Sequence, residues 1–153
     1  MDNDTIPLAD LLAETSISLH ATATDRDDAV RQAGAALIAT GAVDQAYVEA
    51  MLEREKTVST FVGEGVAIPH GTLAVKESVA KDALVFLRFP DGVDWDGNDV
   101  TIVIGIAAKG NGHIALLSQL ATVLMDPDTA EALRNATDVS QVYELLASDD
   151  EED

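Results

Sequence analysis

The chain is 153 residues long and 47% hydrophobic, which is enough for one domain with one core and too much for a chain that is disordered throughout. Its 28 acidic residues outnumber nine basic ones, giving a formal net charge of −19. This charge argues against a nucleic-acid partner, because phosphate binding needs a basic surface. The absence of cysteine excludes disulfides, cysteine nucleophiles and thiolate metal sites.

Hydropathy does not predict a membrane protein. No apolar run approaches the roughly 18–20 residues that are needed to span a bilayer. Residues 1–15 lack the basic and apolar regions of a secretory signal. We therefore expect a cytoplasmic protein that does not insert into the membrane.

The negative charge also predicts the conditions in which the protein works. So many carboxylates repel one another in dilute salt. At about 1 M salt the Debye length falls to roughly 3 Å, and this repulsion is screened. The charge therefore favours a halophilic host, with an ordinary acidic protein from a low-salt cytoplasm as the alternative.

Two helices are predicted in the first third of the chain. Residues 26–40 carry small and apolar side chains at helical spacing, and either Thr24 or Asp25 is placed to cap their start. Asp44 is placed to cap a second helix over residues 45–55, whose apolar residues again form one stripe.

Three strands are predicted next. Residues 66–68 form a short apolar run, and residues 83–89 and 101–107 form longer runs that are rich in strand-forming side chains. Residues 90–92 and 96–98 have the Pro, Asp, Asn and Gly composition of turns. The two long strands are therefore expected to end at these turns.

Three further helices are predicted in the last third. They cover residues 113–125, 127–135 and 139–147, with the Asp-Pro pair at 126–127 and the Thr-Asp pair at 137–138 as starting signals. Strands interspersed with helices predict a single-domain α/β fold in which a mixed central β-sheet is flanked by helices.

The stretch GEGVAIPHGT, residues 63–72, brings a histidine to the end of a short buried strand. Pro69 fixes its own φ and favours an extended Ile68, while Gly71 leaves space beside His70. A ring held at a rigid strand end suits a nucleophile that must approach another molecule closely. The alternative is an ordinary histidine at a strand-to-turn junction.

The other two histidines have different surroundings. His113 opens the helix 113–125, where backbone N–H groups and the helix dipole attract anions, so it could donate a hydrogen bond to a phosphoryl oxygen. A surface histidine in a first helical turn is the alternative. His20 lies among polar residues, and we expect it to be solvated. Histidines at this spacing do not form a ligand set, so no metal is predicted.

The segment before the GEGVAIPHGT stretch offers further polar candidates. Arg54 has a guanidinium group whose geometry matches phosphate oxygens, although it could instead pair with Glu53 or Glu55. Ser59 and Thr60 offer hydroxyl donors in the same segment, with ordinary loop hydrogen bonding as the alternative.

Two longer stretches, YVEAMLEREKTVSTFVGEGVAIPHGT and VIGIAAKGNGHIALLSQLATVL, closely resemble the fructose/mannitol-type enzyme IIA domain (EIIA type 2) of the bacterial sugar phosphotransferase system. The resemblance rests on MLxRE, ST-x-x-G-x-G, AIPHG and a later histidine that opens an apolar helix. AMLEREK and VIGIAAKGNGHI are most similar to the mannitol branch. The resemblance extends over nearly the whole chain and implies one domain over residues 5–148, with an acidic tail over 149–153.

This resemblance implies roles for four residues. His70 would accept a phosphoryl group from phospho-HPr and pass it to a cysteine of an enzyme IIB partner, which phosphorylates the sugar held by the membrane IIC component. His113 would stabilise the phosphoryl group, Arg54 would contact it, and Thr60 would add a hydroxyl donor. No cofactor is implied, and both the sugar and the oligomeric state stay open.

The chemistry of phosphoryl transfer adds two expectations. A histidine nucleophile must be neutral, so we expect one ring nitrogen of His70 to donate to a backbone carbonyl or another acceptor while Nε2 attacks phosphorus. Because molar salt screens electrostatic steering, we expect HPr to dock on an apolar patch near His70 that includes Phe61, Val62 and Leu73.

Two other functions remain open at this point. A nitrogen-type regulatory IIA protein would use the same phosphohistidine but signal through phosphorylation-dependent partner binding. A pure interaction module would have this fold without being phosphorylated at all.

Overall fold

The computed structural model describes residues 11–71, 79–108 and 112–147. Its elements in chain order are β1 (Leu12–Ser18), α1 (Arg26–Ala39), α2 (Gln45–Thr57), β2 (Phe61–Gly63), β3 (Val66–Ala67), β4 (Ala83–Trp95), β5 (Asn98–Ala107), α3 (Gly112–Leu124), α4 (Pro127–Arg134) and α5 (Val139–Ala147).

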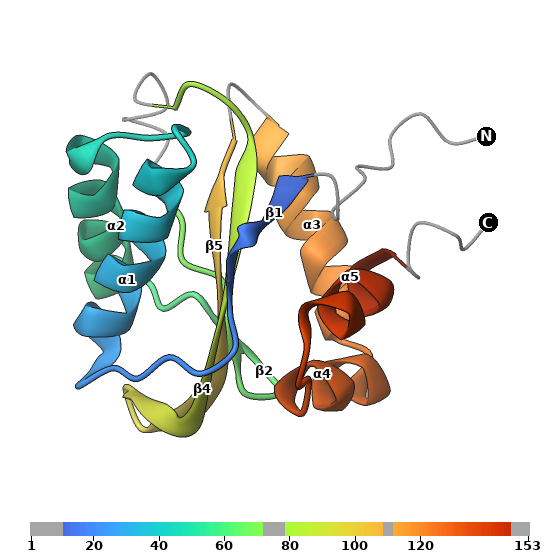
Figure 1. The fold of residues 1–153 in the computed structure, drawn as a ribbon. Helices are drawn as coiled ribbons and strands as arrows, with labels where there is room; N and C mark the ends of the chain where they lie inside the picture. Colours follow the sequence, from blue (N-terminus) through green and yellow to red (C-terminus); the bar gives the residue numbers. More distant parts are fainter. Residues whose placement is uncertain (1–10, 72–78, 109–111, 148–153) are drawn as a thin grey trace.

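A mixed five-stranded sheet lies at the centre of the molecule. Its strand order is β1-β4-β5-β3-β2, in which the pairs β1–β4 and β3–β5 are parallel and the pairs β4–β5 and β2–β3 are antiparallel. The helices α1 and α2 cover one face of the sheet, and α3, α4 and α5 cover the other (Figure 1). The predicted α/β class with a mixed, helix-flanked sheet is therefore confirmed.

The core is divided into two layers by the alternation of side chains along the long strands. On β4, Leu84 and Phe86 belong to the cluster that includes residues of α3, α4 and α5, while Val85 and Leu87 belong to the cluster that includes residues of α1 and α2. Successive side chains of a strand point to opposite faces of a sheet, so both faces of β4 are buried. This explains why its sequence is a continuous apolar run.

The helices begin and end within two residues of the predicted positions. Asp25 caps α1 by accepting a hydrogen bond of 2.8 Å from the backbone N–H of Asp28. Asp44 caps α2 by accepting one of 3.3 Å from the backbone N–H of Tyr47. These caps satisfy N–H groups that have no partner within a helix, which is why the Asp positions predict the helix starts.

The predicted turn at residues 90–92 is wrong. The strand β4 continues through it to Trp95, and its pairing with β5 becomes irregular between Arg88 and Val93. Gly92 has a φ of +80°, a conformation that glycine adopts without a steric penalty. The turn-forming residues therefore produce an irregularity within one strand and not a reversal of the chain.

The turn predicted at residues 96–98 is confirmed as the tip of the β4–β5 hairpin. Trp95 pairs with Asn98, so the hairpin loop has two residues, and both have positive φ, Asp96 at 57° and Gly97 at 94°. Asp-Gly is a sequence that favours this kind of loop. The sequence prediction did not include β1 or β2, neither of which has a long apolar run.

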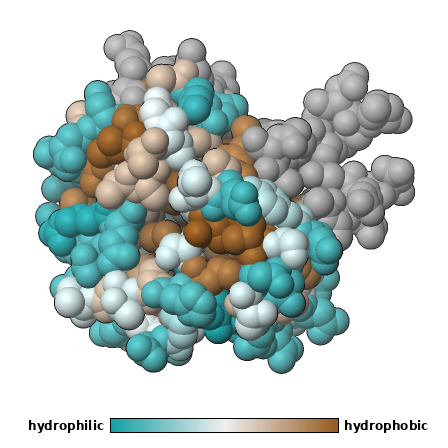
Figure 2. All heavy atoms as spheres, viewed as in Figure 1, coloured by the Kyte–Doolittle hydropathy of each residue, from teal (hydrophilic) through white to brown (hydrophobic). Residues whose placement is uncertain are grey.

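Hydrophilic residues cover much of the periphery of the face viewed in Figure 1, while apolar residues gather near its middle, between β1 and α5 (Figure 2). None of the helices that the structure describes has both the length and the hydropathy to cross a membrane. The predicted acidic tail, residues 149–153, and the predicted docking residue Leu73 lie outside the described residues.

Candidate functional site

His70 lies at the carboxyl ends of two neighbouring parallel strands, β3 and β5. It follows β3 and forms a parallel bridge with Ile106, near the end of β5. The backbone N–H of Ile106 donates a hydrogen bond of 3.1 Å to the carbonyl of Pro69. The carboxyl ends of parallel strands are where α/β sheets commonly bind ligands. The topology therefore places the sequence-predicted histidine at a favourable position.

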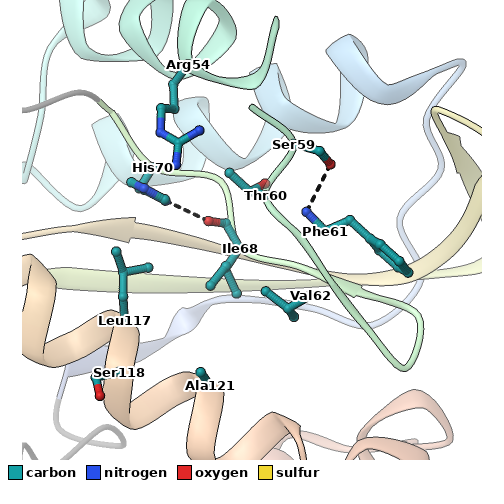
Figure 3. A pocket seen from close by; sticks show the side chains of 10 residues that line it. All are labelled: Arg54, Ser59, Thr60, Phe61, Val62, Ile68, His70, Leu117, Ser118 and Ala121. Carbon is teal, nitrogen blue, oxygen red and sulfur yellow. Dashed lines mark hydrogen bonds between the residues drawn. The ribbon is translucent and has the colours of Figure 1, made fainter. Parts of the chain in front are cut away.

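A cavity of about 330 Å³ opens beside His70. The cavity is lined by residues from four parts of the fold: α2, β2 with the segment before it, the end of β3, and α3 (Figure 3). These residues are Arg54, Ser59, Thr60, Phe61, Val62, Ile68, His70, Leu117, Ser118 and Ala121. Half of these ten side chains are apolar, and only Arg54 carries a permanent charge. The cavity thus brings together three of the four predicted site residues.

His70 is 8% exposed, and a hydrogen bond holds its imidazole in one orientation. Its Nδ1 lies 2.9 Å from the carbonyl oxygen of Ile68. A carbonyl oxygen only accepts hydrogen bonds, so Nδ1 carries the proton in this contact and the lone pair of the neutral ring is on Nε2. The predicted hydrogen bond to a backbone carbonyl is confirmed.

Arg54 reaches the cavity from the last part of α2, and its guanidinium points toward His70 (Figure 3). Its Nη1 donates a hydrogen bond of 2.7 Å to the carbonyl of Val58, just past the end of the helix. A guanidinium has five N–H donors in a rigid plane. One N–H donor therefore fixes the orientation of the guanidinium, and its remaining N–H donors can bind an anion in the cavity.

The neighbouring residue Glu55 is buried, at 2% exposed. Its carboxylate accepts hydrogen bonds from the backbone N–H and the hydroxyl of Thr60, at 2.8 and 2.6 Å, and from the indole N–H of Trp95, at 2.8 Å. The Thr60 hydroxyl is thus bound to Glu55 in this structure, and its predicted role as a phosphoryl donor stays a prediction. Ser59 is exposed, and its hydroxyl accepts a hydrogen bond of 3.1 Å from the N–H of Phe61.

His113 is the fourth predicted site residue. The helix α3 begins at Gly112, so the backbone of His113 lies in its first turn, as the sequence predicts. The side chain of His113 lies outside what the structure describes, and its predicted role stays a prediction. Among the described residues, no three His, Asp or Glu side chains are grouped so that they could hold a metal ion.

Sequence reasoning missed two residues that support this site. Glu55 was considered only as a partner of Arg54, whereas its partners are Thr60 and Trp95. Tyr47 falls within the apolar stripe predicted for residues 45–55, yet its hydroxyl accepts a hydrogen bond from the N–H of Gly71, the residue after His70. A buried polar atom on an apolar helix face, which needs a hydrogen-bond partner, is the signal that could have identified both.

Comparison with known proteins identifies relatives along nearly the whole chain. Residues 10–149 match the family described as "Phosphoenolpyruvate-dependent sugar phosphotransferase system, EIIA 2". The mannitol-specific phosphotransferase enzyme IIA component of Staphylococcus aureus is 39% identical over 140 residues, which cover 90% of this chain and 97% of that protein. A multiphosphoryl transfer protein of Haemophilus influenzae is 44% identical over 136 residues, but the match covers only 27% of its length.

Solved structures with the same fold include proteins of two kinds. One is a complex of enzyme IIA-Mtl and phosphorylated enzyme IIB-Mtl from Escherichia coli. The matching chain of this complex has a TM-score of 0.84 and is 38% identical, and the match covers 90% of the present chain and 99% of the chain in the complex. The nitrogen regulatory protein IIA-Ntr from Neisseria meningitidis has a TM-score of 0.79 and 28% identity, covering 90% of this chain and 97% of its own.

Proposed function

Because this chain belongs to the type 2 enzyme IIA family of the phosphoenolpyruvate-dependent sugar phosphotransferase system, we propose that it carries phosphoryl groups during sugar uptake. His70 accepts the group from phospho-HPr and passes it to a cysteine of an enzyme IIB component. The observation that carries this proposal is the orientation of His70: Ile68 holds its Nδ1 proton, and its ring lines a cavity shared with Arg54.

The first transfer forms one N–P bond and breaks another. The lone pair on Nε2 of His70 attacks the phosphorus of a phosphohistidine on HPr, and the electron pair of the bond that breaks returns to the HPr ring. The Nδ1 proton stays on His70. Its hydrogen bond to the carbonyl of Ile68 stabilises the positive charge that the ring gains.

Charge on the phosphoryl oxygens needs donors that are already in place, because transfer of this group depends chiefly on positioning and electrostatic stabilisation. Arg54 supplies a guanidinium whose orientation is fixed by Val58. His113, in the first turn of α3, is positioned by its backbone at a helix end whose dipole favours anions. Both assignments follow from the family resemblance and are supported by where these residues lie.

The second transfer regenerates the histidine. A thiolate of enzyme IIB attacks the phosphorus, an S–P bond forms, and the electron pair of the N–P bond returns to Nε2. The Escherichia coli complex of enzyme IIA-Mtl with phosphorylated enzyme IIB-Mtl supports this partner. The mannitol-specific enzyme IIA of Staphylococcus aureus supports mannitol as the transported sugar, although the sugar itself is bound by the membrane component.

A regulatory role is the second candidate, since a nitrogen regulatory IIA protein shares the fold. The identity to that protein is 28%, whereas it is 40% to the crystal structure of IIA mannitol from Escherichia coli. The higher identity favours transport. Phosphoryl transfer from this chain to a cysteine-bearing enzyme IIB distinguishes the two roles, because a regulator need not phosphorylate such a partner.

The test is a reconstituted transfer with phosphoenolpyruvate, enzyme I and HPr, followed by intact mass measurement. We expect a gain of one phosphoryl group that is lost in acid, and subsequent labelling of an added enzyme IIB. His70→Ala should abolish both, while His20→Ala, which removes an exposed histidine outside the cavity, should leave both unchanged. Full labelling of the His70→Ala protein would overturn the proposal.

A further inference from the structure

Two hydrogen-bonded connections hold the backbone on either side of His70, and both lead to Ile106. On one side, the carbonyl of Pro69 accepts a hydrogen bond of 3.1 Å from the N–H of Ile106. On the other side, the N–H of Gly71 donates one of 2.9 Å to the hydroxyl of Tyr47. That hydroxyl in turn donates one of 2.7 Å to the carbonyl of Ile106. The tyrosine hydroxyl therefore closes a loop of contacts around His70.

Gly71 has a steric reason to be glycine at this point. A Cβ atom there would lie 2.6 Å from Cε1 of the Tyr47 ring, closer than carbon atoms approach each other. Its φ is not in the left-handed region, so the requirement is for space and not for an unusual backbone conformation. The sequence predicts that the small size of Gly71 leaves space beside the imidazole of His70, whereas in the structure the ring of Tyr47 occupies this space.

We infer that Tyr47 is a positioning residue for phosphoryl transfer: its hydroxyl fixes the backbone after His70 and so directs Nε2 into the cavity that Arg54 lines. This inference rests on the function proposed above. Tyr47 and Arg54 are seven residues apart on α2, close to two helical turns, so both lie on the same side of one rigid element. The helix thus sets the position of the nucleophile relative to the group that binds the phosphoryl oxygens.

The chemistry of a phenol suits both contacts. Only a protonated hydroxyl can donate to the carbonyl of Ile106 while accepting from the N–H of Gly71. Burial raises the pKa of Tyr47 above its ordinary value of 10.0, against the opposing effect of the Gly71 N–H. The hydroxyl therefore keeps its proton at any pH at which the protein works. A phenylalanine in its place would keep the ring and lose both hydrogen bonds.

The test compares Tyr47→Phe with a matched control, Tyr143→Phe. The hydroxyl of Tyr143 also donates to a backbone carbonyl, that of Leu12, at 2.6 Å, but it lies on α5 away from the cavity. For both variants, rapid-quench kinetics with phospho-HPr give kcat and KM, and ¹⁵N spectra of the His70 ring give its tautomer. The kinetics measure transfer, and the spectra measure the orientation of the ring independently of any transfer.

We expect Tyr47→Phe to lower kcat by roughly ten- to a hundredfold, as small misplacements of a reacting group do. KM for phospho-HPr should be unchanged, because both hydrogen bonds of the Tyr47 hydroxyl are buried, and the ring spectrum should shift toward a mixture of tautomers. Tyr143→Phe should match the wild type in all three. Wild-type kcat and an unchanged ring spectrum in Tyr47→Phe would overturn the inference.

Two further results would also test the inference: a Tyr47→Phe protein that does not fold, and a wild-type protein that is not phosphorylated. If Tyr47→Phe does not fold, Gly71→Ala keeps the hydroxyl and displaces the ring, and it should show the same loss of kcat; normal transfer by that variant would refute the inference. If the wild-type protein takes no phosphoryl group from phospho-HPr, the proposed function fails, and the ring spectra of Tyr47→Phe alone decide whether Tyr47 positions His70.

Discussion

At the level of single residues, the site depends on a few polar contacts between positions that are distant in the sequence. His70 and Arg54 could be predicted as candidates because their side-chain types and the motifs AIPHG and MLxRE, in which they stand, point to phosphate chemistry. Glu55 and Tyr47 could not, because their roles depend on Trp95 and Gly71, which are 40 and 24 residues away. No spacing rule reveals a contact that only the tertiary fold creates.

Arg54→Lys should slow transfer from phospho-HPr by roughly a hundredfold, the usual cost of losing a donor aimed at developing charge. A lysine keeps the charge but not the planar set of donors, and it cannot both bind Val58 and face the cavity as Arg54 does. Single-turnover kinetics measure the effect. Arg31→Lys, an exposed change on α1, is the control. Equal rates for the two variants would remove Arg54 from the mechanism.

Glu55→Gln should lower the free energy of unfolding by about 1–3 kcal/mol, because an amide N–H₂ would face donors that now meet a carboxylate oxygen. The carboxylate is buried and accepts three hydrogen bonds, from Thr60 and Trp95. Glu53→Gln, a change at an exposed neighbour whose carboxylate pairs with Lys56, should cost less than about 0.5 kcal/mol. Denaturant unfolding compares them, and similar costs would contradict the assigned network.

At the level of elements, capping signals predicted the helices well because they act within a few residues. The strands were harder to predict. The edge strands β1 and β2 have short or mixed sequences, and pairing to β4 and β3 defines them. Residues 90–92 have turn composition, but pairing with β5 on either side keeps them within β4. Non-local pairing therefore overrode local propensity at this point.

The start of α5 gives a prediction with a defined pH dependence. Asp138 accepts hydrogen bonds from the hydroxyl of Ser140, at 2.6 Å, and the N–H of Gln141, at 3.0 Å. Both hydrogen bonds lower the pKa of Asp138 below its ordinary value of 3.8, and the bond from Ser140 has the larger effect. The stabilisation is therefore complete above pH 3.8 and is lost as the pH falls through the lowered pKa.

Asp138→Ala should accordingly lower the melting temperature by a few degrees near neutral pH, because an N-cap is lost. The difference from the wild-type protein should shrink in strong acid. Glu144→Ala, an exposed change within the same helix, is the control and should have little effect. Thermal unfolding followed by circular dichroism measures both, and a deficit that grows in acid would be inconsistent with this cap.

At the level of the whole molecule, the excess of acidic side chains dominates. The ion pairs of the described residues include those of Arg26, Lys56 and Arg134. Because the sequence has nine Lys and Arg side chains and 28 carboxylate side chains, most carboxylates cannot each have a cation of their own. We therefore expect the stability of the fold to depend on the salt concentration.

We therefore propose that the protein is adapted to high salt. The melting temperature should rise by several degrees between dilute buffer and about 1 M KCl, where the Debye length is roughly 3 Å and repulsion between carboxylates is screened. Because salts also strengthen burial of apolar groups, the control is a variant in which several exposed carboxylates are changed to amides. That variant should gain less from KCl than the wild-type protein. An equal gain, or greater stability in dilute buffer, would contradict the proposal.

The central claim is that Nε2 of His70 carries phosphorus during transfer, and NMR of protein labelled with ¹⁵N-histidine tests it most directly. After incubation with phosphoenolpyruvate, enzyme I and HPr, we predict a ¹⁵N–³¹P coupling at Nε2 of His70 and a proton retained on Nδ1, as the contact with Ile68 requires. Phosphorus on Nδ1, or an unchanged His70 ring in a protein that has gained a phosphoryl group, would contradict this account.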